Sequence, residues 1–140
     1  MIKNIMFNTT SFNGNKFKAE KLVYKSLKKF QKDNKKKNFK KLVTISIVNS
    51  SPVFYFKTVK RKRRKPVEFP FVLSKKLRLS YGLKFILNFC NKFKKESFYK
   101  RLNKEMYDSS KKSSLSFNKT ENIYKEAFIK KKFSNYRWFY

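Results

Sequence analysis

The sequence predicts a mainly α protein: a single helical bundle domain with a protruding two-stranded β-ribbon arm. Apolar residues recur at helical spacing over most of the chain, and one central stretch is rich in β-branched and aromatic residues. The length of 140 residues suits one domain. We therefore predict one domain over residues 1–140, with the ribbon at about residues 53–73 and a short N-terminal arm at residues 1–13.

The first half of the chain predicts a turn and two helices. Gly14 offers the positive φ that commonly ends a helix, so we place it in a turn between two short helices. Apolar residues over 17–30 recur every three or four positions with lysines between them, which predicts a helix ending near Asp33. A second helix is predicted over residues 39–48, and the segment 49–52 (Asn-Ser-Ser-Pro) ends it.

The middle of the chain changes character and predicts the ribbon. Residues 53–59 and 67–73 are β-branched and aromatic, as strands are. Pro70 is compatible with a ribbon because both of its strands are edges. The nine residues 57–65 carry seven positive charges and no negative one. A tip of this kind repels itself, so we expect it to contact phosphate.

Helical spacing returns in the second half. It runs over residues 79–93 and again over 98–106, followed by a polar loop at 109–116. A last helix is predicted from about residue 120 to residue 135.

The charge of the chain points to a polyanionic partner. Lys and Arg number 38 against 8 Asp and Glu, so the net charge is 38 − 8 = +30, while 40% of the residues are hydrophobic. The chain is therefore too apolar for a disordered basic tail and too charged for a free globular domain. Nucleic acid is the partner that this balance predicts.

The residues that most enzymes need are missing. The chain has no His, two Gly and one Cys. It therefore lacks the usual proton-transfer residue, a glycine-rich phosphate loop, and a multi-cysteine zinc site or internal disulfide. We predict a protein that is not an enzyme and has no cofactor or metal.

Candidate phosphate-binding residues lie on the ribbon and at two helix starts. Lysines supply point charges and arginines supply bidentate contacts, while a helix N-terminus adds unpaired N–H groups. The alternative is that these side chains are only solvated, or that the ribbon is a localisation signal. The candidates are Lys57, Lys60, Arg61, Lys62, Arg63, Arg64 and Lys65 on the ribbon, Lys75, Lys76 and Arg78 at one helix start, and Lys16 and Lys18 at the other.

The remaining motifs divide between core and surface. Tyr136, Arg137 and Trp138 either stack on exposed RNA bases, such as those of a tRNA, or pack against the body. Cys90 is expected to be buried, and Glu105 to pair with Arg101 one turn earlier. Six phenylalanines are expected in the core: Phe17, Phe30, Phe39, Phe85, Phe89 and Phe93.

Several segments, in order along the chain, resemble the small-subunit ribosomal protein seven family. They span about residues 14 to 138. The matching segments are Ala19-Glu20-Lys21-Leu22-Val23-Tyr24, similar to A-E-K-I-V-Y; Phe69-Pro70-Phe71 after the basic ribbon, similar to V-P-V; Leu77 to Leu87, similar to R-R-L-A-L-A-I-R-W-L-V; Ser97, Arg101, Leu102, Glu105 and Asp108, spaced as in S-M-A-E-R-L-A-N-E-L-L-D; and Phe133 to Trp138, similar to F-A-H-Y-R-W.

The resemblance implies a structural protein in the head of the small ribosomal subunit. Such a protein binds the 3′ major domain of the small-subunit rRNA, near the tRNA exit site and the emerging mRNA, beside head and platform proteins. The alternative is a basic organellar nucleic-acid-binding protein, either DNA-compacting or transcription-associated.

Composition suggests where the protein works. Lys, Phe and Asn, which have A/T-rich codons, make up 62 of 140 residues. We infer an A+T-rich organellar genome, mitochondrial or alternatively plastid. The sequence shows no signal peptide and no apolar run long enough to cross a membrane, so we expect no membrane partner.

Overall fold

The computed structural model describes residues 2–11, 14–34, 38–61, 64–92 and 96–133. Within these ranges the chain is mostly helical and carries one antiparallel two-stranded sheet, which confirms the predicted fold class. The elements are α1 (Ile2–Thr10), α2 (Lys16–Asp33), α3 (Phe39–Asn49), β1 (Phe54–Arg61), β2 (Arg64–Val72), α4 (Lys75–Lys92), α5 (Phe98–Ser110), α6 (Leu115–Ile129) and the 3₁₀ turn η1 (Lys131–Phe133).

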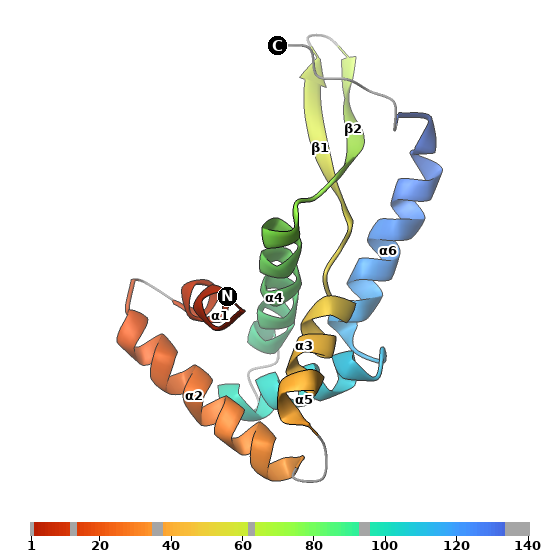
Figure 1. The fold of residues 1–140 in the computed structure, drawn as a ribbon. Helices are drawn as coiled ribbons and strands as arrows, with labels where there is room; N and C mark the ends of the chain where they lie inside the picture. Colours follow the sequence, from red (N-terminus) through yellow and green to blue (C-terminus); the bar gives the residue numbers. More distant parts are fainter. Residues whose placement is uncertain (1, 12–13, 35–37, 62–63, 93–95, 134–140) are drawn as a thin grey trace.

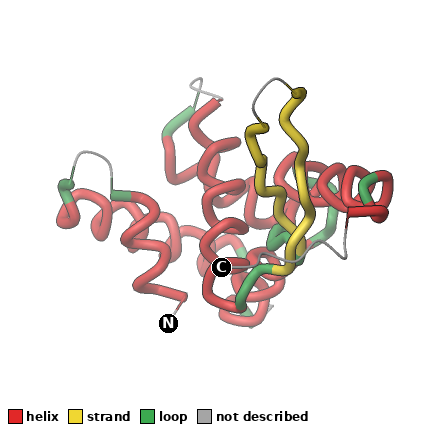
Figure 2. Tube along the Cα trace, turned by 90° about the horizontal axis from the view of Figure 1, so that it is seen from above, coloured by secondary structure: helices red, strands yellow, loops and turns green. Residues whose placement is uncertain are grey.

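The ribbon projects from one end of the helical body. Figure 1 shows it beyond the first turn of α4, with α6 running beside it, while α1 and α2 lie on the other side of α4. Seen from above, the two strands lie side by side (Figure 2). None of the described helices is long and apolar enough to cross a membrane.

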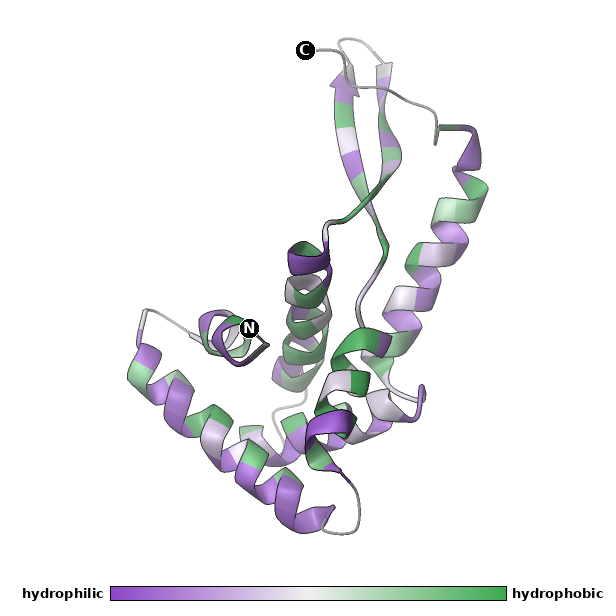
Figure 3. Ribbon diagram, in the orientation of Figure 1, coloured by the Kyte–Doolittle hydropathy of each residue, from purple (hydrophilic) through white to green (hydrophobic). Residues whose placement is uncertain are grey.

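The core is formed where α2, α3, α4 and α5 meet. Phe30, Ile47, Ile86 and Leu102, one from each of these helices, are among its fully buried side chains. The outer helix α2 shows mostly hydrophilic residues interrupted by hydrophobic ones (Figure 3). This pattern is expected of a helix that buries only one stripe.

Short polar residues define where the helices begin. Asn15, Asn38 and Ser114 each accept a hydrogen bond from a backbone N–H three residues later, at 3.2, 3.3 and 3.1 Å. These N-caps satisfy donors that the first helical turn leaves unpaired. Gly14 has φ +73°, which confirms the predicted turn before α2.

Gly82 sets how closely α4 approaches the end of α3. A Cβ atom at this position would lie 2.5 Å from Ser51 Oγ and 3.0 Å from the Ile47 carbonyl oxygen. Ser51 stands three residues before β1. The close contact at Gly82 therefore fixes where the chain leaves the body to form the ribbon.

Three expectations from the sequence differ from the structure. Residues 1–13 were expected to form an arm, but most of them form α1, whose Met6 and Phe7 are buried against the core. The last helix begins at Leu115 rather than near residue 120, because Ser114 caps it. Phe17, expected in the core, is 66% exposed because it lies in the first turn of α2, on the side away from the other helices.

The other aromatic expectations are met in part. Phe30 is fully buried, and Phe39, Phe85 and Phe89 are partly buried, whereas Phe93 lies outside the described residues. Cys90 is buried, as predicted.

Candidate nucleic-acid interface

The basic segment of the ribbon is paired strand rather than loop. The register runs from Phe54 opposite Val72 to Arg61 opposite Arg64, with one irregularity between Val59 and Arg61. The sequence had suggested that residues 60–66 form the tip. Instead the strands extend into this segment, because main-chain pairing continues as far as the arginine pair.

The structure places part of the predicted ribbon site in solvent. The side chains of Lys57, Lys60 and Lys65 are exposed on the paired strands. For Arg61 and Arg64 the structure describes the backbone, and Lys62 and Arg63 lie outside the described residues.

Aromatic side chains fix the base of the ribbon on two helices. Tyr55 stacks on Tyr81 of α4, with ring centroids 4.5 Å apart and an interplanar angle of 27°. Phe54 meets Tyr124 of α6 edge to face at 6.2 Å, and the Tyr124 hydroxyl accepts a hydrogen bond of 3.2 Å from the Val53 N–H. These contacts give the ribbon a set direction relative to the body.

A charged contact holds the middle of the ribbon. Glu68 on β2 forms an ion pair with Lys130, which follows α6. The Lys130 ammonium also lies 4.5 Å from the centroid of the Phe56 ring, so an aromatic face and a carboxylate share one cation. Phe69 and Phe133 add a further edge-to-face contact at 5.5 Å. The ribbon is thus fixed on its α6 side well above its base.

The start of α4 lies directly below the ribbon. The backbone N–H of Leu73, between β2 and α4, donates a 3.0 Å hydrogen bond to the Val53 carbonyl. Lys75 and Lys76 are exposed in the first turn of α4, as predicted, and Arg78 is half-buried. A cleft of about 420 Å³ between α1 and α4 opens beside Lys76. The first turn of α4 thus lies at the end of the body from which the ribbon projects.

The other predicted residues are not brought into this region. Lys16 and Lys18 are exposed at the start of α2, on the far side of α1 from the ribbon (Figure 1). Tyr136, Arg137 and Trp138 lie outside the described residues.

The seam between α2 and α5 carries basic and aromatic residues that the sequence analysis missed. Lys25 and Lys29 of α2 lie 4.9 and 5.1 Å from the centroid of the Tyr99 ring of α5. A hydrogen bond from the Ser97 side chain, together with these lysines and Lys100, lowers the pKa of the Tyr99 hydroxyl. About 70 residues separate the two helices in the chain, so no local pattern in the sequence connects them.

Three titratable residues of the body, Cys90, Glu105 and Arg101, are held in contacts within the protein. Burial, and then the nearby Glu105 carboxylate, raise the pKa of the Cys90 thiol to about 12. The Glu105 carboxylate accepts a 3.0 Å hydrogen bond from the Ser116 N–H, and the Arg101 guanidinium donates to the Cys90 carbonyl. A thiol held protonated is a poor nucleophile. In the part of the chain that the structure describes, no three His, Cys, Asp or Glu residues are placed to hold a metal ion.

Comparison with known proteins gives one consistent result. A family model described as "Ribosomal protein S7p/S5e" matches residues 1–131. A protein of Reclinomonas americana, named small ribosomal subunit protein uS7m, is 27% identical over 133 residues, covering 94% of this chain and 81% of that protein. Proteins named small ribosomal subunit protein uS7 from Phytoplasma australiense and from a Sulfurovum strain are 28% and 25% identical, covering 95% and 94% of this chain and 84% and 83% of their own lengths.

Proposed function

The chain belongs to the ribosomal protein S7p/S5e family and is a protein of the small ribosomal subunit, and on that premise we propose that it binds rRNA through its ribbon and the start of α4. Lys57, Lys60 and Lys65 supply charge on the ribbon, and Lys75 and Lys76 supply it below. These residues contact the phosphate backbone and read the shape of the RNA more than its bases.

The observation that carries this proposal is the way the ribbon is fixed. Tyr81, Tyr124 and Lys130 hold it on two helices, so its lysines keep a defined position relative to those of α4. A flexible basic tail would lose conformational entropy on binding, whereas a ribbon fixed in advance loses little. The net charge of +30 then needs the rRNA for neutralisation.

The finer role follows from the expectations set by the family resemblance. We propose that the protein organises the head of the subunit on the 3′ major domain of the rRNA, near the tRNA exit site and the mRNA exit. Tyr136, Arg137 and Trp138 are the candidates for contact with tRNA or rRNA bases, and neighbouring head and platform proteins are its protein partners. The role is structural rather than enzymatic.

The mitochondrion is the proposed location. The A/T-rich codon usage inferred from 62 Lys, Phe and Asn residues supports an organellar gene, and the Reclinomonas americana relative carries the name uS7m. Fractionation of the source cells, with the protein followed by a specific antibody, tests this location against the plastid and the cytosol.

Sedimentation tests whether the protein is an integral subunit component. Lysate is run through a gradient at high salt, which removes peripheral proteins, and fractions are probed for this chain. We expect it to remain with the small subunit. Release into the free-protein fractions, or co-migration with DNA, would support the alternative of a DNA-compacting or transcription-associated protein.

Binding to rRNA tests the ribbon itself. A transcript of the 3′ major domain is titrated with wild type and with the triple variant Lys57→Glu, Lys60→Glu, Lys65→Glu over a range of salt. About six phosphate contacts predict a slope of log affinity against log salt near −5, at roughly 0.7–0.9 per phosphate, and the variant should reduce its steepness by roughly 2–3. The matched control changes three exposed lysines elsewhere: Lys111, Lys119 and Lys125. Equal effects of the two triple variants would reject the ribbon as the binding element.

A further inference from the structure

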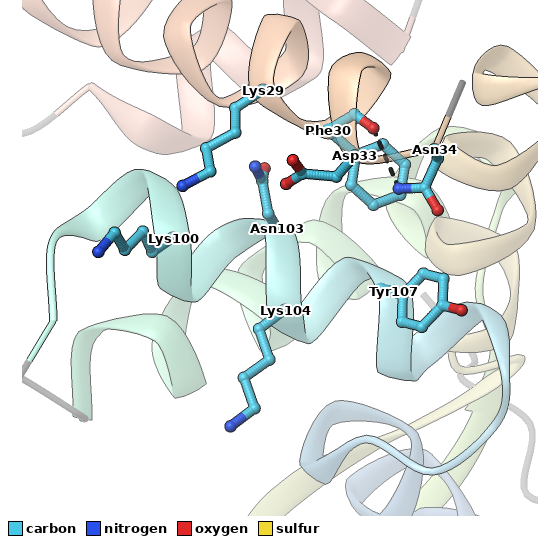
Figure 4. Close-up of a pocket in the computed structure, with 8 residues that line it drawn as sticks. All are labelled: Lys29, Phe30, Asp33, Asn34, Lys100, Asn103, Lys104 and Tyr107. Carbon is cyan, nitrogen blue, oxygen red and sulfur yellow. Dashed lines mark hydrogen bonds between the residues drawn. The ribbon is translucent and has the colours of Figure 1, made fainter.

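A cleft between α2 and α5 has the size and lining of a small ligand site. Its volume is about 340 Å³, at the low end of the roughly 300–1,000 Å³ that ligand pockets occupy. Lys29 and Asp33 line it from α2, and Lys100, Asn103 and Tyr107 from α5 (Figure 4). It lies on the side of the body away from the ribbon, so it is separate from the region already described.

Asn103 is the residue in this cleft that calls for a ligand. Its side chain is only 8% exposed, yet neither its amide nitrogen nor its amide oxygen has a hydrogen-bond partner. Buried polar groups are almost always paired, because an unpaired one destabilises the fold. In Figure 4 the amide extends toward α2, with the Asp33 carboxylate beside it and the Lys29 ammonium nearby. The site therefore holds a donor and an acceptor without partners, next to a carboxylate.

The surroundings of the cleft suit a phosphate. Lys29 and Lys100 line it, and Lys29 also lies 5.1 Å from the centroid of the Tyr99 ring. Lys104 also lines the cleft from α5, with its ammonium extending away from Asn103 (Figure 4). Aromatic rings and lysines placed together are typical of single-stranded RNA contacts, in which bases stack and phosphates meet charge.

We propose that this cleft binds one unpaired guanine nucleotide of RNA. Guanine presents two adjacent N–H donors, N1–H and the N2 amino group, next to the O6 acceptor. The Asp33 carboxylate accepts from the two donors, and the Asn103 amide nitrogen donates to O6, so that the carboxylate and the buried amide nitrogen both gain partners. Adenine, cytosine and uracil lack the pair of adjacent donors that Asp33 would need.

This inference rests on the proposed function only in taking RNA as the partner. The ribbon and the start of α4 bind the backbone of structured rRNA, whereas the cleft reads one base that has left its helix. Recognition of unstacked bases through their edges is the usual way in which proteins obtain sequence preference on RNA.

Base preference is the direct test. Fluorescent pentanucleotides UUGUU, UUAUU, UUCUU and UUUUU are titrated with the full-length protein at one salt concentration. We expect the guanine probe to bind about tenfold more tightly than the others, the size of a good bidentate base contact. Asn103→Leu and Asp33→Asn should each reduce this preference to near one. The matched control is Asn118→Leu, an exposed asparagine of α6 that should leave the preference unchanged.

Stability provides a second measurement, because a ligand-binding role and a structural role for Asn103 predict opposite changes in it. Leucine is similar in size to asparagine and removes the unpaired polar atoms, so Asn103→Leu should raise the urea midpoint of the free protein while it abolishes the guanine preference. A lower midpoint would identify the amide as a structural group and overturn the site. Equal binding of the four probes, or a guanine preference that survives both variants, would overturn it as well.

The two proposals fail separately. The triple ribbon variant should keep the guanine preference, because the cleft is separate from the ribbon. If it leaves binding of the 3′ domain transcript unchanged while the preference persists, the ribbon proposal fails and the cleft stands. If the guanine preference is absent while the ribbon variant impairs transcript binding, the cleft proposal fails and the ribbon proposal stands.

Discussion

The helical body buries polar side chains in hydrogen-bonded contacts, whereas the ribbon exposes its polar side chains to solvent. In the body, Ser50 Oγ lies 2.7 Å from Ser109 Oγ and 3.1 Å from Ser116 Oγ, and Ser109 donates to the Ser46 carbonyl at 2.7 Å. All four serines are fully buried, and the Ser46 hydroxyl donates to the Val43 carbonyl at 2.8 Å. On the ribbon, Lys57, Lys60 and Lys65 stay in solvent. The body uses its polar groups to hold helices together, and the ribbon presents its polar groups to a partner.

The difference indicates how stability and binding are divided in this protein. Small hydroxyls can be buried because each finds a partner within the protein. Ammonium groups cannot be buried unpaired, so a chain of +30 net charge must place them outside. The aromatic contacts at the base of the ribbon connect the two regions, because Tyr81 and Tyr124 belong to the body and contact strand residues.

Truncation of the core should give the largest change in stability. Phe30 is 1% exposed, so Phe30→Ala should lower the free energy of unfolding by about 3–5 kcal/mol, through lost burial and the cavity left behind. The measurement is urea unfolding followed by circular dichroism. Phe128→Ala is the matched control, because Phe128 is 77% exposed and should change stability by less than about 0.5 kcal/mol. Equal losses for the two would contradict the placement of the core.

Removal of one buried hydroxyl should have an intermediate effect. Ser50→Ala deletes a group that bridges Ser109 and Ser116, and should lower the free energy of unfolding by about 1–3 kcal/mol. The double variant with Ser109→Ala measures the coupling. Since the two hydroxyls are partners, their combined cost should be smaller than the sum of the single costs. Strict additivity would show that the two serines act independently.

Alkaline pH should remove the smaller contribution that the buried Cys90 thiol makes to the stability of the body. The folded state raises the pKa of the Cys90 thiol from 9.0 to about 12, so its contribution to stability is fully present below pH 9 and is lost as the pH rises toward 12. The difference in unfolding free energy between wild type and Cys90→Ala should therefore shrink as the pH rises from about 9 toward 12. Comparison with the Ala variant removes the effects of pH that the two proteins share. A constant difference would mean that the thiol is accessible to solvent.

Charge reversal on the ribbon should have the smallest effect on stability. Lys57→Glu, Lys60→Glu and Lys65→Glu together should leave the urea midpoint of the free protein unchanged, because exposed side chains away from the core contribute little. The same variant is expected to weaken rRNA binding. A large loss of stability would show that these lysines hold the fold, and the division between ribbon and body would be wrong.

The elements that could be predicted are those set by local sequence. The apolar spacing of residues 17–30 and of residues 39–48 was sufficient to predict α2 and α3 within one or two residues of the observed bounds. The change to β-branched and aromatic residues located both strands. The basic residues of the ribbon and of the start of α4 were also found, because their charge is visible in the sequence.

Other features depend on which helices meet. Met6 and Phe7 are buried because α2 and α4 cover them, and nothing in the pattern of residues 1–13 indicated this. Phe17 continues the apolar spacing of α2 but has no neighbouring helix to cover it, so it stays exposed.

The sequence by itself determined the class of fold, the basic ribbon and the need for a polyanion, since charge and hydrophobic periodicity are local properties. Only the tertiary structure decided the direction of the ribbon, the serine contacts of the body and the cleft at Asn103. Each of these depends on side chains brought together from distant segments, such as Lys130 with Glu68 or Asp33 with Asn103. Such pairs form because the helices bury their apolar stripes against one another, and the local sequence does not specify which stripes will meet.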